Sequence, residues 1–386
     1  MTNWREVKLG DVCEKVYSGG TPKSSNPMYY NGNIPWLNTK EVHFNRIYKT
    51  EKYITNAGLE NSSAKWVPSN SVIVAMYGAT AGNVAISFIP LTTNQACCNL
   101  IIDENKSTFK FIYYYLLFKN TELASLANGG AQQNLNKQQI KDFPINIPPL
   151  DVQKKIAGVL GALDDKIKLN NKINNNLEQQ MYALVEQDIW NIETKISLDE
   201  FCNVFTGRKN ANEFEKNGVN KFFTCGPEAL TINSFIYDGP AIIVSGNGAY
   251  TGRTRFYNGK FDLYQRTYAC TIKENIKSDY IYILYPILKL QLEKKLMGGT
   301  HGSAIPYIVM NDIAKFQVPF NERVFNKIAP MCKAMIDKIQ ANEAENEKLS
   351  ALRDTLLPEL MSGEIDVSKV DISGLSFADK LSFTDE

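Results

Sequence analysis

Long apolar runs and histidines are both scarce in this chain of 386 residues. No uninterrupted apolar stretch is long enough to cross a bilayer as a helix, and the first residues do not resemble a signal peptide. With only two histidines, a metal site or a catalytic triad built on histidine is not expected. We therefore expect a cytoplasmic protein that has no membrane contact, no metal and no cofactor.

Other familiar signals are also missing. The seven cysteines follow neither a metal-binding spacing nor a disulfide framework, which indicates reduced thiols. The 42 basic and 41 acidic residues nearly cancel, so net charge alone does not predict a polyanionic partner. No GxxxxGK[ST] loop is present, and Thr251 stands where a GxGxxG loop starting at Gly246 needs its third glycine. An ATP-driven motor and a dinucleotide enzyme are therefore not expected.

A helix with a long apolar seam is predicted from Leu150 to about Ile189. Its seam residues recur at alternating steps of four and three, which is the spacing of a coiled coil. No proline follows Pro149 within this stretch, so nothing interrupts the helix. The seam consists of Ile156, Leu160, Leu163, Ile167, Asn170, Asn174, Leu177, Met181 and Leu184.

The stretch from Val324 to Leu357 repeats this helix. Adding 172 to the residue numbers of the first seam leads to matching residues, beginning with Ile156 and Ile328. Two asparagines recur in phase, and such buried amides fix register because an out-of-register partner leaves them unpaired. We expect an antiparallel coiled-coil pair. The helix-register residues are Asn170, Asn174, Asn342 and Asn346. The apolar positions that we expect another subunit to cover include Val159, Leu169, Ile173 and Ile336.

The globular sequence before each helix is also repeated. SVIVAMYGATAG (71–82) and AIIVSGNGAYTG (241–252) align at an offset of 170, so Gly78 and Gly82 coincide with Gly248 and Gly252. Their recurrence in both copies favours a structural turn for these glycines. The predicted fold class is α+β, with two similar mixed α/β domains separated by two long antiparallel helices in a pseudo-twofold repeat. The expected divisions are residues 1–148 (first domain), 149–192 (first helix), 193–320 (second domain), 321–365 (second helix) and 366–386 (tail).

Four segments resemble the specificity (S) subunit of Type I restriction–modification systems, and together the resemblance covers nearly all of the chain. They are GGTPKSSNPMYYNGNIPWLNTKEV, VIVAMYGATAGNVAI, NGGAQQNLNKQQIKDFPINIPPLDVQKKIAGVLGALDDKI and LRDTLLPELMSGEI. The third, in which a polar loop leads into a strand and then a helix start, is specific to this family. The second copy departs from the pattern, because Asn321-Glu322 stands where the first has Pro-Pro-Leu.

The resemblance implies two target-recognition domains, each reading one part of a split sequence in double-stranded DNA. It also implies that the helices dock two methyltransferase subunits, that an endonuclease and translocase subunit joins through them, and that this chain has no catalytic centre. Independently, a helix of about 38 residues is roughly 57 Å long. Because duplex DNA turns once in about 34–36 Å, such a spacer suits two sites one to two turns apart.

Side chains that could read DNA lie on predicted loops, as amides, guanidiniums, hydroxyls and aromatic rings. For any one of them an ordinary solvated loop residue is an equal alternative, whereas the group around the second glycine turn favours DNA contact. In the first domain they are Lys23, Ser24, Tyr29, Lys40, Tyr77, Asn83, Gln132, Gln133 and Asn134. In the second they are Arg208, Lys209, Asn247, Tyr250, Arg253, Arg255, Arg266 and His301.

Two other functions stay open. One is a coiled-coil interaction scaffold with no role on DNA. In that case, replacing Arg253 and Arg255 by alanine would not change how the assembled complex behaves on DNA. The other is an enzyme, a fused DNA methyltransferase or nuclease, which a turnover assay on the purified chain would reveal. If the chain is a specificity subunit, its near-zero net charge predicts weak DNA binding alone and stronger binding with its partners.

Overall fold

The computed structural model describes residues 4–127, 134–301, 306–367 and 370. The chain forms two compact units, Met1–Leu169 with Asn346–Glu386 and Asn170–Glu345. Two long helices, α5 (Leu150–Asp188) and α10 (Glu322–Ser362), contribute to both units. As predicted, α5 begins directly after Pro148-Pro149, where proline's missing N–H costs a helix nothing. Among the described residues, no helix has the length and apolar character needed to cross a membrane.

Strands in the first unit form sheets with the orders β2-β10-β7-β8-β4, β5-β3-β9-β6 and β1-β11. The apolar run Ser71–Ala75 of the repeated segment forms β7, and all of its residues are buried because both faces of its sheet are covered. The strands are β1 (Arg5–Lys8), β2 (Cys13–Ser18), β3 (Tyr30–Leu37), β4 (Asn45–Ile47), β5 (Lys52–Ile54), β6 (Trp66–Val67), β7, β8 (Val84–Ser87), β9 (Leu91–Thr93), β10 (Cys97–Ile102) and β11 (Pro144–Ile147). The short helices are α1 (Asn56–Glu60), α2 (Phe109–Phe118), α3 (Asn120–Ser125) and α4 (Lys137–Asp142).

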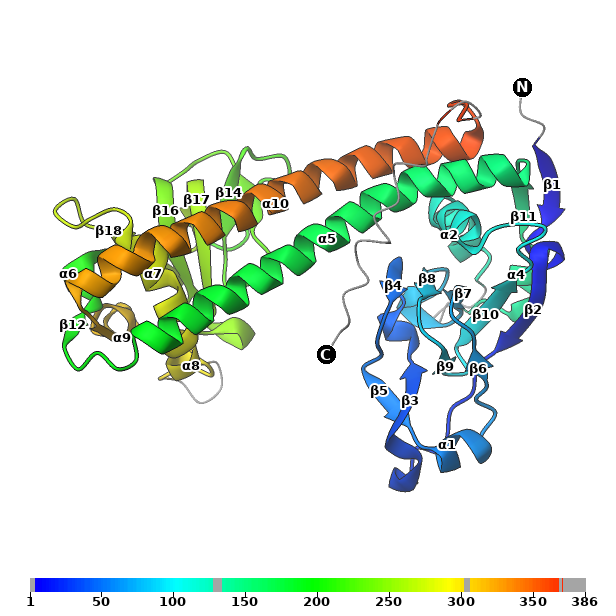
Figure 1. The fold of residues 1–386 in the computed structure, drawn as a ribbon, viewed down its shortest axis with the longest axis horizontal. Coiled ribbons are helices and arrows are strands. Elements are labelled where there is room, and N and C mark those ends of the chain that lie inside the picture. The colour runs from blue at the N-terminus through cyan, green and yellow to red at the C-terminus, as the bar shows by residue number, and fades with distance from the viewer. Residues whose placement is uncertain (1–3, 128–133, 302–305, 368–369, 371–386) are drawn as a thin grey trace. The chain divides into compact units, whose positions relative to one another are not determined.

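The main core of the first unit lies between its sheet and the helix pair. Phe111 of α2 is fully buried there, together with Ile156 and Leu160 of α5 and Leu360 of α10. In Figure 1, α2 lies beside the first part of α5. The predicted seam residues near the start of α5 therefore pack on the globular domain as well as on the other helix.

The described residues of the second unit form a six-stranded sheet, in the order β13-β18-β16-β17-β14-β15, and the pair β12-β19. Gly239 and Gly259 face each other across β16 and β17 with φ of 137° and 139°, conformations that favour glycine. The strands are β12 (Lys195–Ser197), β13 (Cys202–Thr206), β14 (Asn220–Phe223), β15 (Leu230–Ile232), β16 (Tyr237–Ser245), β17 (Thr254–Leu263), β18 (Thr267–Ile272) and β19 (Gln317–Pro319). The helices are α6 (Leu198–Phe201), α7 (Tyr280–Ile287), a π-helical turn (Leu288–Leu292), α8 (Glu293–Leu296) and α9 (Met310–Ala314).

The two long helices are antiparallel in the second unit. Asn170 and Asn174 of α5 bond to Glu345 and Asn342 of α10, at 2.8 Å and 2.7 Å. Both long helices also bury apolar residues against the second domain. Ile336 is only 3% exposed in that core, so the expectation that another subunit must cover it is wrong. The chain's own second domain covers it, which the helix pattern alone did not reveal.

Val159 shows the same effect in the first unit. It lies half-buried against the first core, where the chain's own domain supplies part of the cover expected from another subunit.

Candidate nucleic-acid interface

One end of the six-stranded sheet carries most of the predicted residues of the second unit. There β16 ends at Ser245, which pairs with Thr267 at the start of β18, and Val244 pairs with Thr254 at the start of β17. Strand β13 ends at the same edge, with Thr206 opposite Tyr268. The segments that leave this edge carry the candidates Arg208, Lys209, Asn247, Tyr250, Arg253 and Arg266.

The glycine turn between β16 and β17 has a structural role, as its recurrence predicted. Gly248 and Gly252 have φ of 79° and 87°, and a Cβ on Gly252 would meet the backbone of Leu296 at 2.8 Å. In the first unit Gly78 and Gly82 have φ of 73° and 88°. The same turn is therefore built twice, and it presents different side chains in each unit.

Two of the predicted arginines use their donors inside the protein. Arg255 donates from Nη2 to the carbonyl of Thr224 at 3.1 Å and from Nη1 to that of Pro227 at 3.3 Å. Burial, and then the charge of Arg253, lower the pKa of Arg255 below its ordinary value. Arg253 also donates to the Pro227 carbonyl, at 3.2 Å, and its guanidinium lies 5.5 Å from the ring of Tyr250. Both arginines thus support the loop after β14.

Other cations at this edge project into solvent. Arg208 and Arg266 are exposed, and the backbone carbonyl of Arg266 accepts from Cys225 Sγ at 3.3 Å. Lys209 is half-buried and lies 3.8 Å from a carboxylate oxygen of Glu213, a contact that leaves its ammonium near the surface. Exposed guanidiniums at the same sheet edge are suited to contacts with DNA phosphates and bases.

Aromatic and amide groups complete the edge in both units. Asn247 forms an antiparallel β-bridge with Tyr307, and the ring of Tyr307 stacks on His301 with centroids 5.2 Å apart. In the first unit Tyr77, at the matching position before the glycine turn, forms the same kind of bridge with Asn134. Strand ends and bridges therefore place corresponding residues together in each unit.

The remaining candidates of the first unit are less uniform. Lys23 and Ser24 are exposed, whereas the amide of Asn83 donates inward to the carbonyl of Val42 at 3.1 Å. Lys40 forms an ion pair with Glu51 at 2.8 Å, and this bond raises the pKa of Lys40.

Tyr29 lies half-buried with its carbonyl against Gly58, where an added Cβ would meet that oxygen at 2.5 Å. Gln132 and Gln133 lie outside the described residues.

Sequence reasoning missed the loop after β14 and Tyr307. The carbonyls of Thr224 and Pro227 accept from Arg255 and Arg253, and Cys225 Sγ donates to the carbonyl of Arg266. The Gly226-Pro227 pair signals a turn, but nothing in the sequence pairs that turn with the strand of Arg255. Tyr307 follows the longer segment HGSAIP, whose length hid its correspondence with Asn134.

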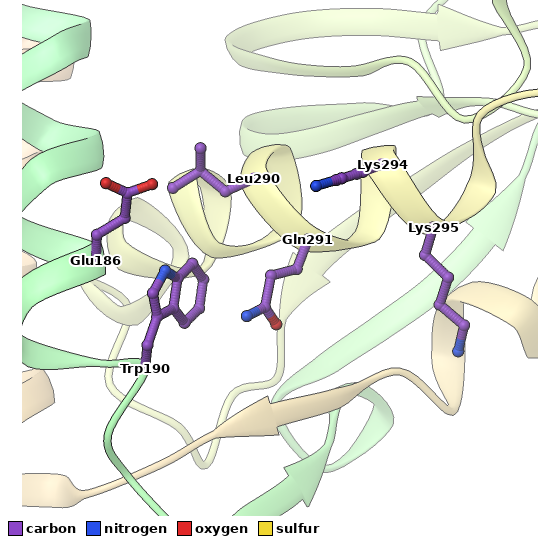
Figure 2. Close-up of a pocket in the computed structure, with 6 residues that line it drawn as sticks. All are labelled: Glu186, Trp190, Leu290, Gln291, Lys294 and Lys295. Atoms are coloured by element: carbon purple, nitrogen blue, oxygen red, sulfur yellow. The ribbon is translucent and has the colours of Figure 1, made fainter.

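Two further observations bear on chemistry. Among the described residues, no group of three or more His, Cys, Asp or Glu side chains could hold a metal ion. A surface cavity of about 600 Å³ lies in the second unit, where Figure 2 shows Glu186 and Trp190 facing Leu290 and Gln291 of the π-helical turn. Its lining is mixed in character and includes none of the predicted DNA-binding residues.

Comparisons with known proteins agree over most of the chain. The family model of the Type I restriction modification DNA specificity domain matches twice, at residues 1–179 and 192–349. The MjaIX specificity subunit of a Type I restriction enzyme from Methanocaldococcus jannaschii is 25% identical, over 95% of both chains. A putative Type I specificity subunit from Mycoplasma genitalium is 22% identical, over 79% of this chain and 85% of its own. The crystal structure of a Type I S subunit from M. genitalium has the same fold, with a TM-score of 0.61 and 18% identity over 93% of this chain and 96% of the other.

Proposed function

The chain belongs to the Type I restriction modification DNA specificity family, and from this premise we propose how its two domains read DNA. It is a specificity subunit of a Type I restriction–modification system. We assign one target-recognition domain to residues 1–148 and the other to residues 193–320, each reading one part of a split target. The helices of residues 149–192 and 321–365 then act as the spacer between them.

The observation that supports this reading is the duplicated sheet edge. In each unit a turn with two left-handed glycines follows a buried strand, and the residue before the turn is bridged to a distant loop. A fixed frame that carries different polar side chains is what two related readers of different sequences require. We propose that Arg208 and Arg266 contact phosphates or bases, and that Asn247 and His301 contribute to base reading.

The partners follow from the family. DNA and the other components of the restriction–modification complex are its partners. We further propose that two methyltransferase subunits dock on the helices, that an endonuclease and translocase subunit joins through them, and that this chain supplies no catalytic residue. We also propose that it acts in the cytoplasm.

The test compares arginines of the same edge in the assembled complex. Methylome sequencing of cells with the complete system first identifies the target. Binding to that duplex is then measured between about 50 and 200 mM salt, where lost phosphate contacts change the slope of log affinity against log salt. Arg266→Ala and Arg208→Ala should each flatten the slope by about one if they hold a phosphate. Unchanged slope and affinity in the double variant would refute the assignment.

Arg255→Ala is the contrasting variant. Its guanidinium is bonded to the carbonyls of Thr224 and Pro227, so the loss should lower the melting temperature of the chain. Arg266→Ala removes an exposed side chain and should leave the melting temperature unchanged. The pair therefore separates DNA contact from support of the loop.

A further inference from the structure

A cluster of charged side chains joins the globular part of the first unit to both long helices. Arg46 of β4 forms an ion pair with Asp165 of α5, and its Nη2 lies 3.6 Å from Oδ2 of Asp164. Nη2 also donates to the carbonyl of Gly161 at 3.3 Å. Arg353 of α10 reaches the other oxygen of Asp164, with its Nη1 at 2.9 Å. One carboxylate therefore connects β4, α5 and α10.

The cluster is shielded from water and has aromatic walls. The hydroxyl of Tyr114, a buried residue of α2, donates to Asp164 at 2.5 Å, and the guanidinium of Arg46 lies 5.7 Å from the ring of Phe88. The side chain of Arg46 is 11% exposed, and those of Asp164 and Asp165 are each 15% exposed. Desolvated ion pairs contribute little net stability, but they strongly disfavour any arrangement that separates their partners. Such a cluster specifies one geometry between the elements that it joins.

The second unit has no such cluster at its repeat-related positions, among the residues that the structure describes. By the offset of 172, Asp164 corresponds to Ile336 and Arg353 to Met181, and both of these are buried in an apolar core. Asp165 corresponds to Asp337, which instead pairs with Lys333 of its own helix at 2.7 Å. Apolar packing is non-directional, whereas hydrogen-bonded ion pairs are directional. Both units pack apolar residues of the long helices, and the first unit adds this cluster of directional ion pairs.

We propose that Arg46 is a positioning residue, which fixes the first recognition domain on the helix pair so that only one gap between the two halves of the target is accepted. The inference rests on the proposed function, in which two domains read two separated words. One base pair advances the duplex by about 3.4 Å and turns it by roughly 35°, so a domain held at one angle discriminates against a gap that is one base pair longer or shorter. Loosening that angle should relax the gap while the words themselves stay the same.

The experiment uses the assembled methyltransferase complex and a plasmid library in which the gap between the two halves of the target varies. Methylation of each plasmid is read by sequencing, for the parent chain and for Arg46→Gln and Asp165→Asn. We expect methylation at gaps one base pair from the parent value to rise about tenfold relative to the parent gap, which corresponds to roughly 1.4 kcal/mol. The half-site sequences methylated should be unchanged.

Asp337→Asn is the matched control, because it removes the same carboxylate at the repeat-related position and breaks only a pair within one helix. It should leave gap selection as in the parent. If Arg46→Gln does not fold, as judged by its melting curve, Asp165→Asn and Arg46→Lys decide the question.

Unchanged gap selection in folded Asp165→Asn and Arg46→Lys would overturn the inference. Loss of methylation at every gap by a folded variant would also overturn it, since that result indicates a binding role. If the parent complex methylates no split target, the proposed function itself fails.

Discussion

Replacing Asn342 by leucine should destabilise the second unit more than replacing Asn342 and Asn174 together. Asn342 Nδ2 donates to Asn174 Oδ1 at 2.7 Å, and the two residues are 1% and 8% exposed. A single substitution leaves a desolvated amide without its partner, which costs about 1–3 kcal/mol, whereas removing both amides is close to neutral. For a unit of this size, that cost lowers the melting temperature by roughly 2–4 °C per kcal/mol.

The assay is a double-mutant cycle with Asn342→Leu, Asn174→Leu and the pair. The free energy of unfolding is measured by denaturant titration. Amide hydrogen exchange is also followed on those peptides of α5 and α10 that belong to the second unit, so that its stability is distinguished from that of the first unit. Asn175→Leu serves as the control, because Asn175 follows Asn174 on α5 but is exposed. Its replacement should change the free energy of unfolding by at most about 0.5 kcal/mol.

An Asn342→Leu variant as stable as the parent would contradict this prediction. So would a double variant whose loss of stability equals the sum of the two single losses to within about 0.5 kcal/mol, because additive losses mean that the two amides do not interact. A coupling energy of about 1 kcal/mol or more supports a buried amide pair. If the pair also fixes helix register, the double variant should adopt more than one alignment of α5 against α10.

Three further outcomes are expected. Gly82→Ala should cost more stability than Gly78→Ala in parallel melts, because both have positive φ but only a Cβ on Gly82 meets a neighbour, Ala124 at 2.8 Å; equal costs would contradict this. Target DNA should slow maleimide labelling of the half-buried Cys225 in the complex, and labelling at an unchanged rate would place this edge away from DNA. Burial raises the pKa of the Cys270 thiol to about 12. The contribution of this thiol to stability should therefore be complete below pH 9 and decline as the pH rises from there towards 12. Cys270→Ala should make the melting temperature less dependent on pH over that range, and an unchanged dependence would contradict the prediction.

Features set by local pattern were predictable from the sequence. The start of α5 at Leu150 and the strand Ser71–Ala75 follow from a proline pair and an apolar run, whose physical effects act within a few residues. The cluster around Arg46 was not predicted, because its partner Asp165 is 119 residues away and an arginine in a short strand has no periodic signal. Periodicity identifies the apolar face of a helix, but it does not say which element covers that face, as Ile336 shows.

Residue type was a weaker guide at the interface. Arg253, Arg255 and Arg266 are the same amino acid near one sheet edge, yet Arg255 donates to two backbone carbonyls while Arg266 is exposed. The difference arises because the loop after β14 folds over one arginine and not the other, and that loop reaches the edge through pairings set elsewhere in the sheet. Side-chain chemistry therefore names candidates, whereas burial decides which of them face solvent.

The division between inward-facing and exposed residues indicates which substitutions can change the DNA sequence that the protein reads. Gly82 and Gly252 close the same turn in both units, and Asn83 and Arg255 turn inward to carbonyls, so substitutions at these positions disturb the frame. Exposed neighbours such as Arg266 can vary without cost to folding, because their side chains are not packed. New specificity should therefore arise by exchange of exposed edge residues on an unchanged turn, and altered half-sites that appear only with substitutions of inward-facing residues would contradict this division.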